Sequence, residues 1–392
     1  MKILLFIFSA LCFTSFGQYT YQNSQGPATL RVVDFIDQNS GYIGGNSGKL
    51  LKTGNGGDDW AILNGPTNEK INSLSMVSTD VFYFTAGETL GAYYLYKSVT
   101  GGATFEELFI PNSDDPYSVE FLDAQTGFVS ARFGGIYKTV NGGVSWYNVL
   151  SSTNILGTHF VSPQVGYGFG INTIYKTTDG GENWTYMFNS GMFNLGNTQF
   201  QTMFFSSEGH GHVGSEYYGQ LVSSQDDFLT VVDHLYDWSI MDIYFTSDMV
   251  GYVVEFANPG DRILKTTDGG VTWNIFHTLG QTMLDQYYVN ENLGWIVGSG
   301  GTIMKYEPNA SISEVEDFDL LEVSPNPATD QINIAVKDVE IEEVMIFSNQ
   351  GVEMKHLPFE GGKLDISNLD PGMYHLVVTT SKGELTEKVV KY

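Results

Sequence analysis

The sequence predicts an all-β protein, a seven-bladed β-propeller followed by a small antiparallel β-sandwich. A short motif, best written Lys-Thr-x-Asp-Gly-Gly, returns along the chain. Its lysine stands at 52, 97, 138, 176, 265 and 305, with Val222 in the equivalent place of the fifth copy, so copies are 38 to 46 residues apart. That period is typical of propeller blades. The 45 glycines suit short strands joined by turns, and no long segment has helical periodicity.

The segment 1–17 has the order of a secretory signal peptide. An apolar run follows Lys2, and small or polar residues continue to Gly17, where we expect cleavage. The run is too short to cross a bilayer comfortably, so no membrane span is expected in the mature chain. The single cysteine, Cys12, lies in this segment, so disulfides are not expected after cleavage. Lipid attachment at Cys12 is the alternative, although Leu11 stands where such signals need a small residue.

The chain is strongly acidic, with 18 Lys and Arg against 45 Asp and Glu and a formal net charge of −27. Nucleic acid and anionic lipid surfaces are therefore not expected as partners. Negative charge also keeps an exported protein soluble. Attraction for cations or for a basic partner is the alternative interpretation.

Each repeat is interpreted as four strands that run from the inner to the outer edge of one blade. In the third repeat we expect them at 118–122, 127–130, 135–139 and 146–149. A single blade would leave two apolar faces in water, and stacking blades around a ring buries them. The seventh repeat ends at Tyr306 after three strands, whereas Tyr19-Thr20-Tyr21 form a strand with no partner before it. We therefore expect the N-terminal strand to complete the last blade of a propeller spanning 18–308.

A tight turn follows the third strand of most repeats. The copies are KTGNGGDDW from Lys52, KTVNGGVSW from Lys138, KTTDGGENW from Lys176 and KTTDGGVTW from Lys265, with weaker ones, KSVTGGATF from Lys97 and SSQDDF from Ser223. These turns resemble the Asp-box, or BNR repeat. Asp or Asn can bond main-chain N–H groups ahead of it, and Gly accepts left-handed dihedrals. We expect a structural role for Asn55, Trp60, Asn141, Trp146, Asp179, Trp184, Asp268 and Trp273.

A feature that recurs once in each blade cannot converge on one substrate, so a catalytic role for these turns is not expected. The fifth copy, Asp226-Asp227-Phe228, lacks the glycines, and its blade is expected to be the least regular.

The KTTDGG repeat, with second strands such as GYVV and GWIVG, also resembles the photosystem II assembly and stability factor propellers over residues 19–306. The resemblance implies an exported scaffold that binds proteins. Those relatives use a basic patch of arginines, which this chain lacks, so a photosynthetic role is not carried over. The expected partner is an unknown extracellular protein or polysaccharide.

The C-terminal part has a different pattern. An acidic linker is expected at 309–319 and a β-sandwich at 320–392, with turns at 349–351 and 370–372. The segments VSPNPATDQINI, LDISNLDPGMYHLVV and KVVKY resemble the type A C-terminal sorting domain of the type IX (Por) secretion system. The resemblance implies export by that machinery across the outer membrane of a Bacteroidota-type cell, followed by release or surface attachment. Its motif residues are Pro325, Asn326, Pro327, Gly372, Tyr374, Lys388 and Lys391.

A ligand is expected at one end of the propeller, on loops between blades and between second and third strands. The candidate binding residues there are acidic and aromatic, with two arginines: Arg132, Phe133, Glu216, Tyr217, Tyr218, Trp238, Glu255, Phe256 and Arg262. Exposed aromatics can stack sugar rings or peptide side chains, although packing against their own loop is the equal alternative.

We expect a non-catalytic recognition or scaffold module, with no cofactor. No metal site is expected either, because the pair His210 and His212 has no third ligand at a defined spacing. The alternative is a sialidase-like glycosidase with a divergent site. That chemistry needs three arginines around a sugar carboxylate, and the chain has only Arg31, Arg132 and Arg262.

Overall fold

The structure, a computed structural model, describes residues 18–87, 92–111, 115–151, 155–170, 173–189, 200–215, 219–235, 239–257, 260–307, 321–336, 341–348, 354, 357–380 and 383–392. The chain divides into two compact units, Met1–Ser311 and Ile312–Tyr392. The expected signal peptide at 1–17 and linker at 309–319 lie outside the described residues.

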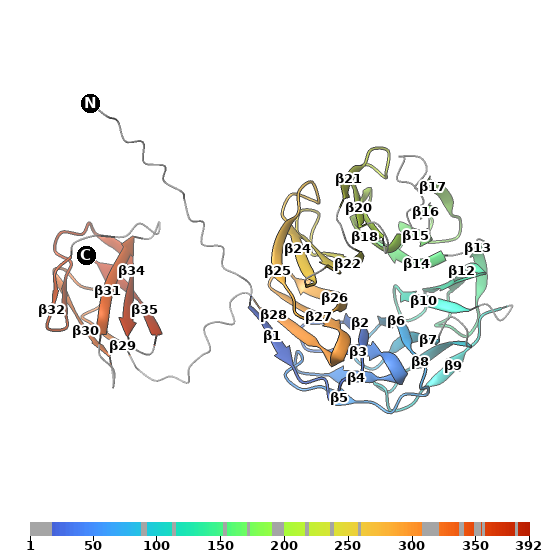
Figure 1. Ribbon diagram of the computed structural model, residues 1–392, viewed down its shortest axis with the longest axis horizontal. Helices are drawn as coiled ribbons and strands as arrows, with labels where there is room; N and C mark the ends of the chain where they lie inside the picture. The colour runs from blue at the N-terminus through green and yellow to red at the C-terminus, as the bar shows by residue number, and fades with distance from the viewer. Residues whose placement is uncertain are drawn as a thin grey trace. The chain divides into compact units, whose positions relative to one another are not determined.

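The first unit is a ring of seven four-stranded antiparallel sheets, which confirms the predicted propeller (Figure 1). Blade one consists of β2 (Leu30–Phe35), β3 (Gly41–Gly45), β4 (Leu50–Thr53) and β5 (Ala61–Ile62). Blade two consists of β6 (Ile71–Met76), β7 (Phe82–Gly87), β8 (Tyr93–Ser98) and β9 (Glu106–Leu108). Blade three consists of β10 (Pro116–Phe121), β11 (Gly127–Ala131), β12 (Gly135–Thr139) and β13 (Tyr147–Leu150).

Blade four consists of β14 (Ile155–Phe160), β15 (Gly166–Gly170), β16 (Thr173–Thr177) and β17 (Thr185–Asn189). Blade five consists of β18 (Phe200–Ser207), β19 (His210–Ser215), β20 (Gln220–Ser224) and β21 (Val232–Leu235). Blade six consists of β22 (Ile240–Phe245), β23 (Gly251–Glu255), β24 (Arg262–Thr266) and β25 (Asn274–Thr278). Blade seven consists of β26 (Met283–Asn290), β27 (Leu293–Gly298), β28 (Ile303–Glu307) and β1 (Gln18–Gln22). Short 3-10 turns lie at Asn46–Gly48 and Ser299–Gly301. In Figure 1 the first strand of each of blades one to seven lies nearest the centre.

The ring is closed by the N-terminal strand, as predicted. β1 pairs antiparallel with β28, so that Tyr19 lies opposite Tyr306. The two rings pack with centroids 5.1 Å apart, and the Tyr19 hydroxyl lies 3.2 Å from that of Tyr288. The last blade is therefore built from both ends of the propeller sequence, and β28 is paired on both sides.

Neighbouring blades pack through an aromatic ring at the end of the inner strand. Phe121, the last residue of β10, lies opposite Gly127, the first residue of β11. A Cβ atom on Gly127 would come within 2.6 Å of the Phe121 ring, so glycine is needed to make room for it. The same ring stacks on Tyr83 of blade two with centroids 3.5 Å apart. Equivalent stacks join Tyr167 to Phe205 at 3.4 Å and Trp295 to Phe35 at 3.6 Å.

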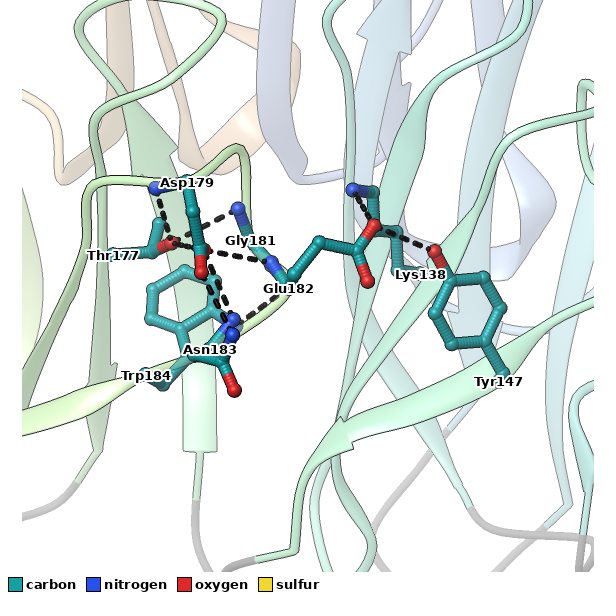
Figure 2. Close-up of polar contacts among 8 residues, drawn as sticks. All are labelled: Lys138, Tyr147, Thr177, Asp179, Gly181, Glu182, Asn183 and Trp184. Carbon is teal, nitrogen blue, oxygen red and sulfur yellow. Dashed lines mark hydrogen bonds and ion pairs between the residues drawn. The ribbon is translucent and has the colours of Figure 1, made fainter.

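The turn after the third strand is held by its own side chains, as Figure 2 shows for blade four. The Thr177 hydroxyl accepts a hydrogen bond from Gly181 N (2.9 Å) and donates one to Asp179 (2.8 Å), which accepts another from Asn183 N (2.9 Å). Gly181 has a φ of +82°, which disfavours other residues. The Trp184 indole donates to Gly181 O (3.2 Å) and meets the Phe160 ring edge to face. We call these segments the box turns, 53–60, 98–105, 139–146, 177–184, 224–231 and 266–273.

Among the described residues, the lysine of the repeat connects one blade to the next at five of the seven interfaces. Lys138 of blade three lies 2.6 Å from Glu182 in the box turn of blade four, and the Tyr147 hydroxyl donates to the same carboxylate (Figure 2). Two of the other lysines donate to a glycine carbonyl: Lys52 of blade one to Gly101 O of blade two at 3.3 Å, and Lys97 of blade two to Gly142 O of blade three at 2.8 Å. The remaining two pair with acidic side chains: Lys176 of blade four with Asp227 of blade five at 2.7 Å, and Lys305 of blade seven with Asp58 of blade one at 3.8 Å. The repeated lysine is thus a contact between blades.

The fifth blade requires one correction. His212 of β19 lies opposite Ser223 of β20, just as Tyr42 lies opposite Lys52, so Ser223 and not Val222 occupies the lysine position. The error arose because the spacing alone does not give the register of a copy whose motif has diverged.

The box turn of the fifth blade keeps the hydrogen bonds of the others although it lacks their glycines. Phe228 N donates to Ser224 Oγ and Thr230 N to Asp226 Oδ1, each at 2.8 Å. Asp227 and Phe228 take φ values of +59° and +60°, where glycine normally stands. The irregularity expected for this blade therefore appears here as backbone strain and not as loss of the turn.

The second unit consists of two small sheets. One contains β29 (Leu321–Ser324), β30 (Gln331–Val336), β33 (Lys363–Asp365) and β32 (Phe359–Glu360), and the other β31 (Ile341–Ser348), β34 (Gly372–Thr380) and β35 (Gly383–Lys391). Buried residues of both sheets, including Ile332, Ile334, Leu376 and Val378, form one core. Alternate residues of β30 are buried, as the sandwich prediction required.

The Pro325-Asn326-Pro327 segment is bonded to the last strand of this unit. Asn326 accepts a hydrogen bond from Val390 N (2.9 Å) and donates one to Lys388 O. The Tyr374 hydroxyl donates to Asp370 O (2.8 Å) at the start of β34. Residues that the sequence placed in three separate motif segments therefore support one another's strands.

Candidate functional site

The candidate site is the central channel of the propeller. Residues of all seven inner strands line a cavity of about 430 Å³ there. The side chains divide into a polar group and an aromatic group. The polar group comes from every blade except the fifth, and its acidic members, Asp34, Glu120, Asp242 and Asp285, come from blades one, three, six and seven.

Most polar side chains of the channel already bond the main chain of the next blade. Asp34 accepts a hydrogen bond from Met76 N (2.7 Å), and Glu120 accepts one from Phe160 N (2.8 Å). His159 Nε2 lies 2.8 Å from Phe205 O, which it bonds as a donor. Asp285 of blade seven accepts from Val33 N of blade one at 2.7 Å, across the point of closure. These groups therefore hold the inner strands in register.

Burial shifts the protonation equilibrium of three channel acids toward the neutral form. Burial raises the pKa of Asp34 and of Asp242 to about 7, in each case against hydrogen bonds that lower it. Burial first, and the neighbouring Asp242 charge second, hold the pKa of Asp285 well above its ordinary range. Each side chain lies deep in protein but keeps a part open to the channel. A cationic group entering the channel would favour the ionised carboxylates.

The aromatic group occupies one side of the same channel. Phe204, Tyr244 and Tyr287 come from the inner strands of blades five, six and seven. The Tyr244 ring lies 5.0 Å from Phe204 and 5.2 Å from Tyr287 between centroids. Aromatic faces beside carboxylates attract cations and also stack against planar or apolar groups.

The channel residues were not predicted, because a ligand site was expected on the loops and not on the inner strands. They lie in strands, one or three residues before the aromatic that ends each inner strand, as in VVDF, VEF and MDIYF. An acid at that place in a strand otherwise apolar is the signal that could have identified Asp34, Glu120 and Asp242.

Two of the predicted loop residues form an ion pair within blade six. Arg262 contacts both carboxylate oxygens of Glu255, with Nη2 to Oε1 at 3.0 Å and Nε to Oε2 at 2.9 Å. The Glu255 side chain is fully buried, so this pair positions the loop between β23 and β24. Neighbouring Phe256 keeps 41% of its surface exposed.

Two further predicted loop residues lie in another blade. Arg132 and Phe133 belong to blade three, where the guanidinium lies 5.9 Å from the centre of the Phe133 ring. Phe133 is 63% exposed. Glu216, Tyr217, Tyr218 and Trp238 lie outside the described residues. The described loop residues therefore lie in two separate blades.

The three arginines that a sialidase-like site would need lie in three different blades. Arg31 lies in β2, Arg132 follows β11 and Arg262 begins β24, in blades one, three and six. Arg262 is committed to Glu255. One member of the triad is therefore used in maintaining the fold.

The histidine pair is divided by its surroundings. Burial lowers the pKa of His212 to about 3, and its Nδ1 lies 2.9 Å from Ser223 Oγ. His210 Nδ1 lies 3.7 Å from Asp248. Across the described ranges, no group of three or more metal-ligating side chains is arranged to hold an ion. None of the helices in the described part of the chain is long and apolar enough to span a membrane.

The fold and channel define a seven-bladed β-propeller that carries a separate C-terminal β-module. Residues 18–154 match the family of the photosynthesis system II assembly factor YCF48, and residues 322–392 match the secretion system C-terminal sorting domain. The chain thus joins a Ycf48-like propeller to a Por-type sorting domain, as the sequence analysis predicted.

Individual relatives are distant. The photosystem II assembly lipoprotein Ycf48 of Nostoc sp. is 21% identical over 312 residues, which cover 76% of this chain and 89% of the relative. The structure of YCF48 from Cyanidioschyzon merolae has a TM-score of 0.60 at 17% identity, covering 74% of this chain and 99% of that one. A structure of YCF48 bound to a D1 peptide has a TM-score of 0.58 at 16% identity, and the match covers 74% of this chain and 97% of that one. The structure of a GH74 xyloglucanase from Xanthomonas campestris has a TM-score of 0.60 at 12% identity, and the match covers 96% of this chain and 74% of that one. At these identities the structural likeness shows the fold alone.

Proposed function

We propose that this protein is a secreted or surface-displayed, non-catalytic propeller that binds a basic segment of an extracellular protein at the mouth of its central channel. The sorting domain delivers it through the type IX secretion system. The observation that carries the proposal is the use of the channel side chains. Asp34, Glu120 and Asp285 each accept a main-chain hydrogen bond from the next blade, which supports a scaffold role for these carboxyl groups.

The chemistry of the channel supports a cationic ligand. Carboxylates of Asp34, Asp242 and Asp285 lie with the rings of Tyr244 and Tyr287 around one cavity. A lysine or arginine side chain entering there would meet negative charge and aromatic faces together. The net charge of −27 would attract a basic partner from a distance. The YCF48 structure bound to a peptide supports peptide recognition by this kind of propeller.

The proposal is tested by binding on the full secreted chain. A peptide array that varies only the number of Lys and Arg residues should give binding that rises with positive charge, with calorimetry to measure Kd. Asp34→Asn keeps the acceptor for Met76 N but removes the charge, so it should weaken binding of the best peptide several-fold at pH 8. Binding that is indifferent to peptide charge, or to Asp34→Asn, would contradict the proposal.

A glycoside hydrolase is the second candidate function, and one observation favours it. Asp242 and Asp285 lie on adjacent inner strands, both with raised pKa, and a raised pKa is what a general acid needs at neutral pH. The propeller fold is also that of a xyloglucanase. Release of sugar from xyloglucan or sialosides, abolished by Asp242→Asn, would establish this function in place of the first.

A further inference from the structure

The contact between blades five and six differs from the others in its lysine position. At five interfaces, a lysine of one blade reaches the box turn of the next and contacts the first glycine carbonyl or an acidic side chain there. In blade five Ser223 stands in that position, and its hydroxyl bonds His212 at 2.9 Å. The short side chain lies beside the second glycine of the next turn, where a Cβ atom built on Gly270 would lie 3.0 Å from Ser223 Oγ, and it carries no charge.

A pocket lies where the lysine side chain would run. Its volume is about 130 Å³, and its walls include Ser223 and Ser224 of blade five with Gly269 and Gly270 of blade six. Gly269 is the equivalent of Gly101 and Gly142, whose carbonyls accept hydrogen bonds from Lys52 and Lys97. Since a water in the liquid takes about 30 Å³, the pocket has room for an ammonium group with a short alkyl stem.

The neutral side-chain amide of Gln225 lies near Gly269 at about the place where the Lys97 ammonium lies near Gly142. A Cβ atom built on Gly142 would lie 3.3 Å from Lys97 Nζ, and one built on Gly269 would lie 3.2 Å from Gln225 Nε2. Gln225 is exposed, so it can be displaced. His234 supplies one bond to this turn, at 2.9 Å to Gly270 O, which is the second glycine and not the first.

The surroundings favour a positive charge. The two turns that border the pocket carry Asp226 and Asp268, and hydrogen bonds from Thr230 and Thr272 hold the pKa of each below its ordinary range. Both are therefore negative at neutral pH.

We infer that the pocket between the box turns of blades five and six binds a primary ammonium group, the chemistry of a lysine side chain supplied by another molecule. The ligand would complete from outside the contact that Lys52, Lys97, Lys138 and Lys176 make from within the chain. This site is separate from the central channel, so it does not depend on the proposed function.

The test uses the full secreted chain and n-propylammonium chloride, with tetramethylammonium chloride at the same concentration as the matched control. Both are monovalent cations, but only propylammonium donates N–H hydrogen bonds. Propylammonium should raise Tm by about 2 °C in a saturable manner, and tetramethylammonium should not. Equal effects of the two salts on the natural protein would overturn the inference.

Two variants locate the effect. Ser223→Lys supplies an internal ammonium, so it should raise Tm and lose the propylammonium response. Lys97→Ser empties the equivalent place in blade two, so it should lower Tm and gain a larger response by chemical rescue. Should Ser223→Lys not fold, Val232→Phe narrows the pocket from an exposed wall position and should also abolish the response. A propylammonium response that persists in Ser223→Lys or in Val232→Phe would refute the site.

Discussion

Phe82, the first residue of β7, lies directly opposite Met76, the last residue of β6, and this pair reverses the arrangement of the other blades. In the other blades an aromatic at or near the end of the inner strand lies opposite a glycine at or near the start of the second strand: Phe35 with Gly41, Phe121 with Gly127, Phe160 with Gly166, Phe205 with Gly211, Phe245 with Gly251 and Tyr288 with Gly294. The Phe82 ring packs against Tyr42 of blade one with centroids 4.1 Å apart. In blade two the aromatic ring that packs against the previous blade thus comes from the second strand, whereas in the other blades it comes from the inner strand.

The reversal predicts that the two residues are coupled in stability. Phe82→Gly should cost about 3 to 5 kcal/mol of unfolding free energy, because it leaves a cavity beside Tyr42. Met76→Phe alone should also destabilise the protein, since two rings would compete for one space. The double variant recreates the pattern of Phe121 and Gly127 and should recover most of the loss. Urea unfolding of the three variants gives the coupling energy, and simple additivity would contradict the interpretation.

The box turns could be predicted because their hydrogen bonds join residues at most four positions apart, as between Thr177 and Gly181. The contact of Lys138 with Glu182 could not, because the partner is one blade further along the chain. The same limit applies to the channel. Whether Asp34 faces the channel depends on how each blade is placed in the ring, which no local pattern contains. Sequence reasoning therefore chose loop residues, and two of these, Glu255 and Arg262, form an internal ion pair.

The pair of Glu255 and Arg262 should behave as a structural unit. Arg262→Met removes the guanidinium that pairs with the fully buried Glu255 carboxylate and should cost about 3 to 5 kcal/mol of stability. Combining it with Glu255→Gln should restore much of the loss, because the buried negative charge is then removed as well. Thermal unfolding at pH 7 measures both. Arg132→Met is the matched control from blade three, where the guanidinium lies near the Phe133 ring, and should change stability little. A double variant no more stable than Arg262→Met would contradict this account.

The conformation of the box turn should depend on Asp179 at acid pH. Hydrogen bonds from Asn183 and Thr177 lower the pKa of Asp179 to about 2. A lowered pKa in the folded state means that the ionised carboxylate stabilises the turn above the unfolded pKa, and that this stabilisation is lost as the pH falls through about 2. Asp179→Asn copies the natural Asn141 of blade three and should remove this acid dependence while leaving the turn intact. The carboxyl titration of Asp179 followed by NMR would contradict the account if its midpoint lay at 4.

Export should require the second unit. Removing residues 312–392 takes away the segment that matches the sorting domain and leaves the propeller unit intact. The truncated protein should remain in the periplasm of the producing cell, whereas the full chain reaches the medium or the surface. Cell fractionation with an antibody to the propeller measures this. Asn326→Ala removes two hydrogen bonds to the last strand and should reduce export in part, with Asn333→Ala of the same unit as a milder control. Normal secretion of the truncated chain would end the assignment of the tail.

The channel acids should make the protein less stable as the pH rises. The pKa of Asp34 and of Asp242 is about 7 in the folded protein, above the unfolded value of about 3.9. Between these values the folded state binds more protons than the unfolded state, so stability falls with rising pH and levels off above 7. Three pKa units correspond to about 4 kcal/mol for each group as an upper limit, because channel water still reaches part of each carboxyl.

Asp34→Asn removes this titration without removing the acceptor for Met76 N. The variant should therefore be more stable than the natural protein at pH 8 and equal to it at pH 4, as measured by urea unfolding at the two pH values. Asp37→Asn, at an exposed turn of the same blade, is the matched control and should give no gain at pH 8. A basic peptide seated in the channel should reduce the difference, because its positive charge stabilises the ionised carboxylate. If Asp34→Asn were destabilising at pH 8, the charge of Asp34 would be a requirement of the fold and not a cost that a ligand relieves.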